Sequence, residues 1–341
     1  MVYNNNKRKG ETMMNLRNPA SLKAPAADAL RRSGPEAKRI VLIYAGVVAA
    51  AALLLSSLNF VLEEQIGSTG GLSGMGTRAI LSSVQSFLTV LQSVALPFWE
   101  MGYLYAAMRL ARSQNTPDKT LLEGFRRFGP VLRLRLLMGA LLMGIAALCV
   151  FPSYQIFSFT PAGYGLIQQM APYALDTETL DAAMQSEPAV IAAMQAAIPV
   201  LTLIYGGLVL LIAVPVMYRF RMANYALLDA PEKGALAAMR TSRELMWHNR
   251  VALLRLDLRF WWYYLAQLLL MFIAYGDVLL SFLNITPPWS DTISYFLFSI
   301  TALVCQTLLY YFARNRIEVT YVMAYDSLLG TGSAAQSNPE A

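Results

Sequence analysis

The side chain best placed to do chemistry is a carboxylate inside an apolar segment, Glu100 in "LPFWEMGYLY". Ionisable groups at membrane depth are costly to desolvate and often serve proton or substrate transfer. Counting from Ile80 at a rise of 1.5 Å per residue places Glu100 about 30 Å along its helix, near the inner membrane boundary. Glu100 therefore has two interpretations. We favour structural pairing with an arginine of a cytoplasmic helix, such as Arg126, Arg127 or Arg133, and the alternative is a proton or substrate site.

Other residues with reactive side chains do not assemble into a recognisable catalytic pattern. His248 has no second His, Cys or clustered carboxylate at metal-ligand spacing, which argues against zinc. The sequence contains no Gly-x-Ser-x-Gly and no Walker motif. Cys149 and Cys305 both lie in apolar segments and are interpreted as small hydrophobic residues. We expect no catalytic, cofactor or metal site and no enzymatic activity.

The remaining side chains that could bind a ligand are the Lys and Arg residues, which give the chain a net charge of +6. Lys and Arg beside a membrane span attract anionic lipids, contributing about 1 kcal/mol per cation near the surface. A nucleic-acid site would need basic and base-reading side chains on a soluble domain, and none is present. Binding of a protein partner and assembly into a homo-oligomer are both compatible with the sequence. The candidate contacts to lipid head groups are Arg126, Arg127, Arg133, Arg135, Arg240, Arg250, Arg255 and Arg259.

The residues discussed above lie within or beside long apolar blocks of the sequence. Hydrophobic residues make up 56% of the chain and charged residues 14%, far from the globular average of about 45 to 50% and about 25%. Blocks of about 20 continuously apolar residues predict transmembrane helices rather than alternating β-strands. Six such spans are expected, at Ile40–Leu62, Ile80–Met108, Val131–Phe151, Ile191–Tyr218, Leu256–Tyr275 and Ile293–Phe312.

The distribution of positive charge predicts the orientation of these spans. With the N-terminus inside and six crossings, Arg78 is the single cation among the 27 Lys and Arg that falls in an expected outer loop. Lys and Arg near spans are retained on the cytoplasmic side. Both termini are therefore expected in the cytoplasm, with the protein in the cytoplasmic membrane.

Three short stretches resemble one another, and each leads into an apolar run, which indicates an internal repeat. They are "PAADALRRSGP" from Pro25, "PDKTLLEGFRRFGP" from Pro117 and "PEKGALAAMRTSR" from Pro231. We expect one membrane domain over residues 21–328, built from parallel units 21–112, 113–221 and 222–328. Each unit would be a cytoplasmic amphipathic helix followed by two spans. Residues 1–20 and 329–341 are expected to be disordered.

The second stretch has the clearest signals for an interfacial helix. Thr116 is a suitable N-cap and Pro117 suits the first helical position. A helix over 117–128, ended by Gly129 and Pro130, would place its apolar side chains on one face toward lipid. Those side chains are Leu121, Leu122, Phe125 and Phe128.

Prolines inside two spans and one long outer loop are the other unusual features. Pro97, Pro199 and Pro215 would each break a helical hydrogen bond and kink spans two and four. Kinked spans occur in transporters, but a kink set by the repeat is the commoner explanation. The loop 152–187 carries aromatics and acids without Lys or Arg, and would cap the bundle or engage an outer partner.

The segment "SRELMWHNRVALLRLDLRFWWYYLAQ", Ser242–Gln267, is similar to the hallmark of a bacterial multipass family known as domain of unknown function 975. His248 and Arg259 depart from its pattern, at positions where glycine and a small polar residue are usual. "ANYALLDAPEKGAL" also resembles a turn of YciC-like membrane proteins. The resemblance implies a membrane protein of undefined activity.

Together these features predict an all-α polytopic membrane protein with six transmembrane helices in three parallel hairpin repeats. The leading hypothesis for function is a non-enzymatic protein that associates with lipids or partner proteins. The alternative is a transporter or permease-like subunit that uses the kinked spans and Glu100.

Overall fold

The computed structural model describes residues 20–68, 75–173, 183–184, 186–276 and 291–336. Every regular element within these ranges is helical. The chain divides into two compact units, one formed by Met1–Leu132 with Met222–Ala341 and the other by Arg133–Arg221. Within the described residues, five helical segments are long and apolar enough to cross a membrane. These segments are Leu22–Leu62, Ala79–Ala111, Phe128–Ser158, Pro188–Asp229 and Phe296–Gly330. The expectation of an all-helical chain with membrane-type helices is confirmed at this level.

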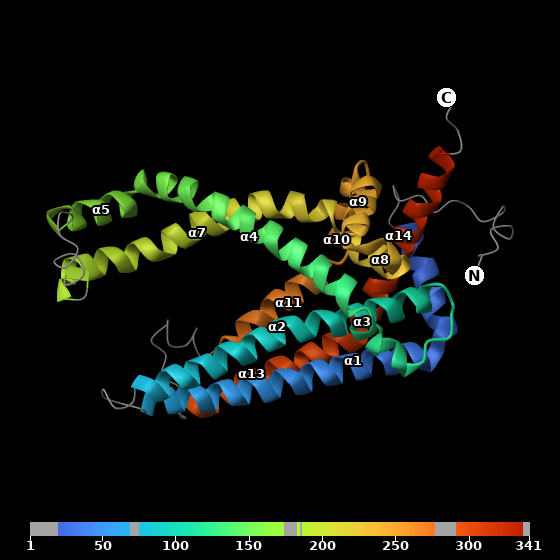
Figure 1. Cartoon of the computed structure of the whole chain (residues 1–341), viewed down its shortest axis with the longest axis horizontal. Helices are drawn as coiled ribbons and strands as arrows, with labels where there is room; N and C mark the ends of the chain where they lie inside the picture. Colours follow the sequence, from blue (N-terminus) through green and yellow to red (C-terminus); the bar gives the residue numbers. More distant parts are fainter. Residues whose placement is uncertain (1–19, 69–74, 174–182, 185, 277–290, 337–341) are drawn as a thin grey trace. The chain divides into compact units, whose positions relative to one another are not determined.

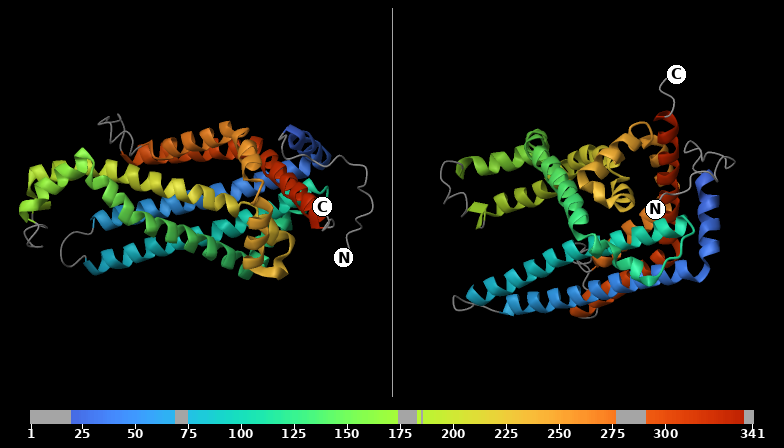
Figure 2. Two further views of the ribbon diagram at one scale, coloured as in Figure 1. Left: turned by 90° about the horizontal axis from the view of Figure 1, so that it is seen from above. Right: turned by 45° about the vertical axis from the view of Figure 1, so that its right-hand side comes forward.

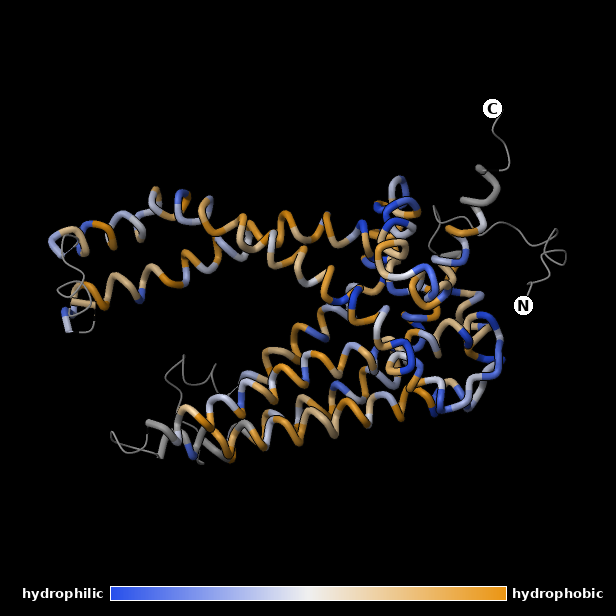
Figure 3. Tube along the Cα trace, in the orientation of Figure 1, coloured by the Kyte–Doolittle hydropathy of each residue, from blue (hydrophilic) through white to orange (hydrophobic). Residues whose placement is uncertain are grey.

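Three long helices lie side by side in the first unit: α1 (Ala20–Ser68), α2 (Met75–Ala111) and α13 (Asp291–Leu309) (Figure 1). Large apolar side chains such as Leu54 and Phe87 are exposed along them. Figure 3 shows apolar residues running along these helices and hydrophilic ones gathered at one end of the unit. A lipid environment is the solvent that suits such a surface, because exposed apolar area of this extent is unfavourable in water.

The helix α1 changes direction at Gly34, which has a φ of 50° and a ψ of −122°. Glycine adopts this left-handed φ without steric cost, and the following Pro35 disfavours a helical conformation at the preceding residue. The chain before the first apolar block is therefore helical up to the Gly-Pro pair. Figure 2 shows the short N-terminal part of α1 turning away from its long part.

The core of the first unit sits near this turn. Tyr44 of α1 and Tyr103 of α2 stack with ring centroids 4.4 Å apart. Around them pack small residues of α1, Leu121, and Val319 of the last helix. The long apolar helices are thus anchored to one another at one end, and this end carries most of the polar side chains described below.

The second repeated stretch differs from the expected interfacial helix over 117–128. It forms a 3₁₀-helix, η3 (Asp118–Leu122), and a single α-turn, α3 (Glu123–Arg126). Pro117 is the N-cap residue, and the Thr116 hydroxyl donates to the Gln114 carbonyl at 2.9 Å, so the prediction of a Thr116 cap is wrong.

The prediction that Leu121 faces lipid is also wrong, because the side chain is 1% exposed. The cause is the absence of a side chain at Gly102, where a Cβ would lie 1.8 Å from the Leu121 carbonyl oxygen, so η3 packs directly on α2. Pro130 does not end a helix here. It lies in the first turn of α4 (Phe128–Ser158), where its missing N–H leaves no hydrogen bond unmade.

The third repeated stretch follows α8 (Ala223–Asp229) and forms η5 (Pro231–Lys233) and α9 (Gly234–Met246). The fifth expected span is interrupted: α10 (Arg250–Leu258) ends before α11 (Trp261–Ala274) begins. The backbone turns here, where the Phe260 amide donates to the Asp257 carbonyl at 2.8 Å. At 14 residues, α11 is about 21 Å long, short of a hydrocarbon core of about 30 Å. Residues 277–290 lie outside the described part.

The last helix continues from α13 through a π-helical turn, η6 (Tyr310–Arg314), into α14 (Asn315–Gln336). A π-turn adds one residue to the helical register and rotates the side chains that follow it. Because α14 extends to Gln336, residues 329–336 are helical, whereas the sequence predicted a disordered tail from 329.

The second unit contains most of α4 together with α5 (Pro161–Met170), η4 (Ala171–Tyr173) and α7 (Pro188–Arg219). Cys149 packs with Ile145 and Ala213 in a small apolar cluster. The Thr160 hydroxyl caps α5 by accepting from the Gly163 amide at 3.1 Å, and α5 packs against α7. Part of the expected outer loop is therefore helical and covers its own unit, while residues 174–182 lie outside the described part.

Candidate functional site

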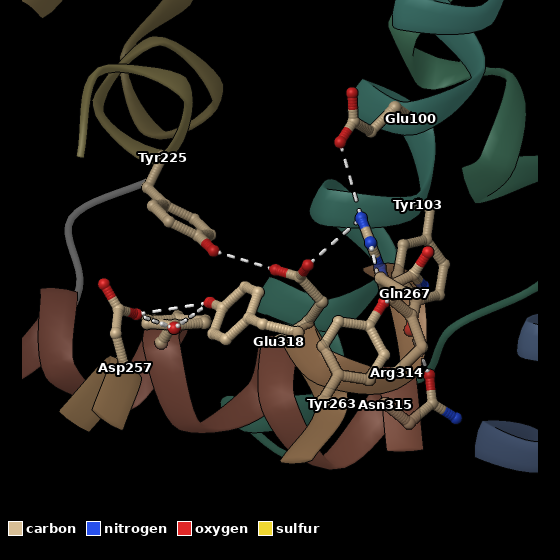
Figure 4. Close-up of polar contacts among 11 residues, drawn as sticks. Glu100, Tyr103, Tyr225, Asp257, Tyr263, Gln267, Arg314, Asn315 and Glu318 are labelled. Atoms are coloured by element: carbon tan, nitrogen blue, oxygen red, sulfur yellow. Dashed lines mark hydrogen bonds and ion pairs between the residues drawn. The ribbon is translucent and has the colours of Figure 1, made fainter. Parts of the chain in front are cut away.

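Glu100 lies on α2, three residues after Pro97, through which the helix continues. Its carboxylate Oε1 is 3.4 Å from Nη2 of Arg314, and its side chain is 37% exposed (Figure 4). Glu100 is thus paired with an arginine, although not with one of a cytoplasmic amphipathic helix as the sequence predicted. Its partner is Arg314, from the end of the last apolar helix, rather than an arginine of the second repeated stretch.

Arg314 is the centre of a buried polar network in the first unit. Its side chain is 15% exposed, and Nη2 also lies 3.2 Å from Oε1 of Glu318, one turn further along the helix. Nη1 donates to the Tyr263 hydroxyl at 3.3 Å. The guanidinium carbon lies 5.4 Å from the ring centroid of Tyr310, in cation–π range. The π-turn ends at Arg314, so the altered register is part of what directs this side chain into the core.

Hydrogen bonds carry the network to other helices. Glu318 accepts from the Tyr225 hydroxyl of α8 at 2.9 Å. The Tyr103 hydroxyl of α2 donates to Oδ1 of Asn315 at 2.7 Å, and the Asn315 amide donates to the Ala37 carbonyl of α1. These hydrogen bonds join four helices, α1, α2, α8 and α14.

A second buried carboxylate lies on α10. Asp257 is 9% exposed and accepts hydrogen bonds from the hydroxyls of Tyr264 and Tyr321 (Figure 4). Desolvating a carboxylate is costly unless donors replace its lost water, and the two tyrosines supply them. These bonds attach α10 and α11 to α14, which gives a physical reason for the interruption of the fifth apolar block.

A third polar contact joins α2, α8 and α14 through one arginine. Arg112 Nη1 lies 2.7 Å from Asp229, and Nη2 lies 2.7 Å from Asp326. Burial on its own would lower the pKa of the Arg112 guanidinium, but hydrogen bonds to the two aspartates outweigh it and place the pKa above its ordinary value. Arg112 is therefore fully charged at any physiological pH.

The arginines predicted to contact lipid head groups have different surroundings. Arg127 is bound to Glu123 at 3.2 Å and to the Leu228 carbonyl, and it stacks on Tyr105. Arg126 is exposed and lies 3.6 Å from Glu123. Arg127 therefore stabilises the fold, and Arg126 is directed to the surface.

Three candidates belong to one short stretch of the first unit. Arg250 begins α10, Arg255 lies in its last turn and Arg259 follows directly, the latter two being exposed. No described carboxylate forms an ion pair with any of the three. Arg240 on α9 is exposed in the same way. Arg133, exposed, and Arg135, half-buried, belong to the second unit.

Exposed tryptophans flank these cations. Trp247 and Trp261 are each 61% exposed, and the Arg250 guanidinium carbon lies 5.9 Å from the Trp247 ring centroid. Exposed indoles interspersed with arginines are typical of the boundary between lipid and water. We use the name α10 surface for α10, Trp261 at the start of α11, and the residues Arg240, Trp247 and Arg259.

The sequence did not reveal Arg314, Glu318 and Asp257 as members of a buried network. One signal was available, since Arg314 and Glu318 are spaced four residues apart in "ARNRIEV" at the end of an apolar helix. Glu100, which pairs with Arg314, is more than 200 positions away, and no local sequence pattern connects the two residues. In the described part of the chain, no three His, Cys, Asp or Glu side chains come together as metal ligands would.

No curated protein and no solved structure matches the chain. Residues 48–330 match the family described as "Protein of unknown function (DUF975)", a range that covers α2, α4, α7 and the Arg314 network apart from its contact with Ala37 of α1. That range also contains the Ser242–Gln267 segment on which the resemblance was based. The chain belongs to this DUF975 family.

Proposed function

We propose that this protein is a non-enzymatic multipass protein of the bacterial cytoplasmic membrane that binds anionic lipid head groups at its inner face. The proposed topology has six spans in three parallel units, with both termini in the cytoplasm. The span that is fifth in chain order includes α11. Five helices of sufficient length and apolarity support the membrane setting.

The observation that carries the proposal is the composition of the α10 surface. Arg255 and Arg259 are exposed beside Leu258 and Trp261, which are exposed as well. In water the apolar members of this set would be unfavourably hydrated, and in hydrocarbon the arginines would be. The head-group layer satisfies both, because arginine pairs with phosphate while indole lies at the apolar boundary.

Charge gives this surface its preference among lipids. About 1 kcal/mol per cation near a membrane surface corresponds to about fivefold in binding to an anionic lipid. Arg240, Arg250 and Arg255 together therefore favour an anionic over a zwitterionic head group by about two orders of magnitude. Such binding organises lipid around the protein and requires no catalytic residue.

Native mass spectrometry of the full-length protein in neutral detergent tests the proposal. We expect phosphatidylglycerol to be retained over phosphatidylcholine of the same acyl chains. The variant Arg240→Gln/Arg250→Gln/Arg255→Gln should lose most of this preference, while the matched Arg→Lys triple variant, which keeps the charge, should retain it. Equal retention of both lipids by the unmodified protein would refute the proposal.

A further inference from the structure

The turn at Gly34 brings the N-terminal part of α1 onto the helices that border the α10 surface. Ala26 and Ala29 are buried in the same core as Val319 of α14. Lys23 projects from this segment, and its Nζ lies 4.6 Å from the ring centroid of Phe260. The contact fixes an ammonium group over an aromatic ring between α10 and α11.

Two further cations lie on the segments that meet at this contact. Arg259 directly precedes Phe260 and is exposed, and Arg316, in the first turn of α14, is exposed as well. Phe260 is also within 6.3 Å of the Tyr321 ring of α14, centroid to centroid. The charges of Arg259 and Arg316 both act on the Lys23 ammonium, so each arginine lies within electrostatic reach of Lys23.

This grouping of like charges has no acidic counterpart among the described side chains. Lys23, Arg259 and Arg316 take part in none of the recorded ion pairs. Asp257 is the acid nearest to Arg259 in sequence, and it is buried with two tyrosine hydroxyls as its donors. Mutual repulsion of three cations is unfavourable unless an anion compensates it. The arrangement therefore favours an anionic ligand over an empty surface.

We propose that Lys23, Arg259 and Arg316 form a discrete site for the phosphate of one anionic phospholipid. This proposal rests on the proposed function and adds to it two residues from two further segments, Lys23 of α1 and Arg316 of α14. Arginine and lysine together offer the fork and point-charge donors that phosphate oxygens accept. Exposed Trp261, next to Phe260, places the site at the level of a lipid head group rather than of free phosphate.

The site should show itself as one tightly bound phosphatidylglycerol on the full-length protein in neutral detergent, measured by native mass spectrometry. Lys23→Gln/Arg316→Gln should weaken this binding about 25-fold, at about fivefold per cation. The control Arg32→Gln/Lys38→Gln removes the same charge from exposed positions of α1 and should change it less than about twofold. Lys23→Arg/Arg316→Lys should retain it.

The outcomes separate this site from the α10 surface. If the tight lipid persists in Lys23→Gln/Arg316→Gln but is lost in the Arg240, Arg250 and Arg255 variant, the site is refuted and the proposed function stands. If the unmodified protein shows no preference for phosphatidylglycerol, both are refuted. If Lys23→Arg/Arg316→Lys loses the lipid as completely as Lys23→Gln/Arg316→Gln does, the site is refuted in favour of a folding defect. If millimolar inorganic phosphate displaces the lipid, the site is refuted in favour of a free-phosphate ligand.

Discussion

Replacing Arg314 by glutamine should destabilise the first unit more than any exposed arginine does. Arg314 and Glu318 are 15% and 10% exposed at the side chain, and Nη2 lies 3.2 Å from the Glu318 carboxylate. Removing one member of such a pair leaves a buried charge uncompensated, which costs about 3–5 kcal/mol. Glu100 adds little, because it is 37% exposed and its ion pair is correspondingly weak.

The assay is unfolding in mixed micelles of rising dodecyl sulfate fraction, followed by far-ultraviolet circular dichroism. Arg314→Gln should cost about 3–5 kcal/mol, and Arg314→Gln/Glu318→Gln should cost less than the single change because no charge is left unpaired. The control Arg243→Gln, at an exposed position of α9, should stay within about 0.5 kcal/mol of the unmodified protein. A cost below about 1 kcal/mol for Arg314→Gln, or a double variant less stable than the single one, would refute the reasoning.

Three smaller perturbations test the elements that position the site. Gly34→Ala places a side chain at a φ of 50° and should cost about 1–2 kcal/mol, seen as a lower unfolding midpoint in the same micelles. Gly102→Ala would set a Cβ 1.8 Å from the Leu121 carbonyl oxygen and should cost about 2 kcal/mol or more, whereas Gly139→Ala, with open space around it, should be neutral or stabilising. An unchanged midpoint for Gly102→Ala would contradict the close packing of η3 on α2. Because the pKa of Arg112 is raised on folding, the stabilisation by its guanidinium is fully present below the pKa of the unfolded chain and is lost only as the pH rises above it, far beyond the physiological range. Arg112→Lys should therefore lower stability by about 1–2 kcal/mol at both pH 7 and pH 9, and a difference that vanished at pH 9 would be contrary to this account.

Hydropathy and local backbone chemistry were enough to predict much of the fold. Continuous apolar blocks correspond to α2, α4 and α7, because a helix is the structure that satisfies its own backbone in lipid. The Gly34-Pro35 pair ends the first short helix through local conformational preferences, but such an end was predicted from the sequence only at Gly129 and Pro130.

Long-range contacts decided what the sequence could not reveal. The Leu121 side chain was predicted to face lipid, but Gly102, about 20 residues earlier, provides the space that buries it. The fifth apolar block breaks where Asp257 binds tyrosines of α11 and α14. The partner of Glu100 lies 214 positions away, so hydropathy could indicate an unusual carboxylate without identifying what neutralises it.

Thiol labelling of intact spheroplasts tests most directly that this chain spans the membrane with its basic face inside. In a background of Cys149→Ala and Cys305→Ala, single cysteines replace the exposed Glu187, which precedes α7, and the exposed Lys233, which precedes α9. A membrane-impermeant maleimide should label Glu187→Cys in intact spheroplasts and Lys233→Cys only after lysis. The reverse pattern would contradict the orientation, and labelling of both positions before lysis would contradict the proposed topology.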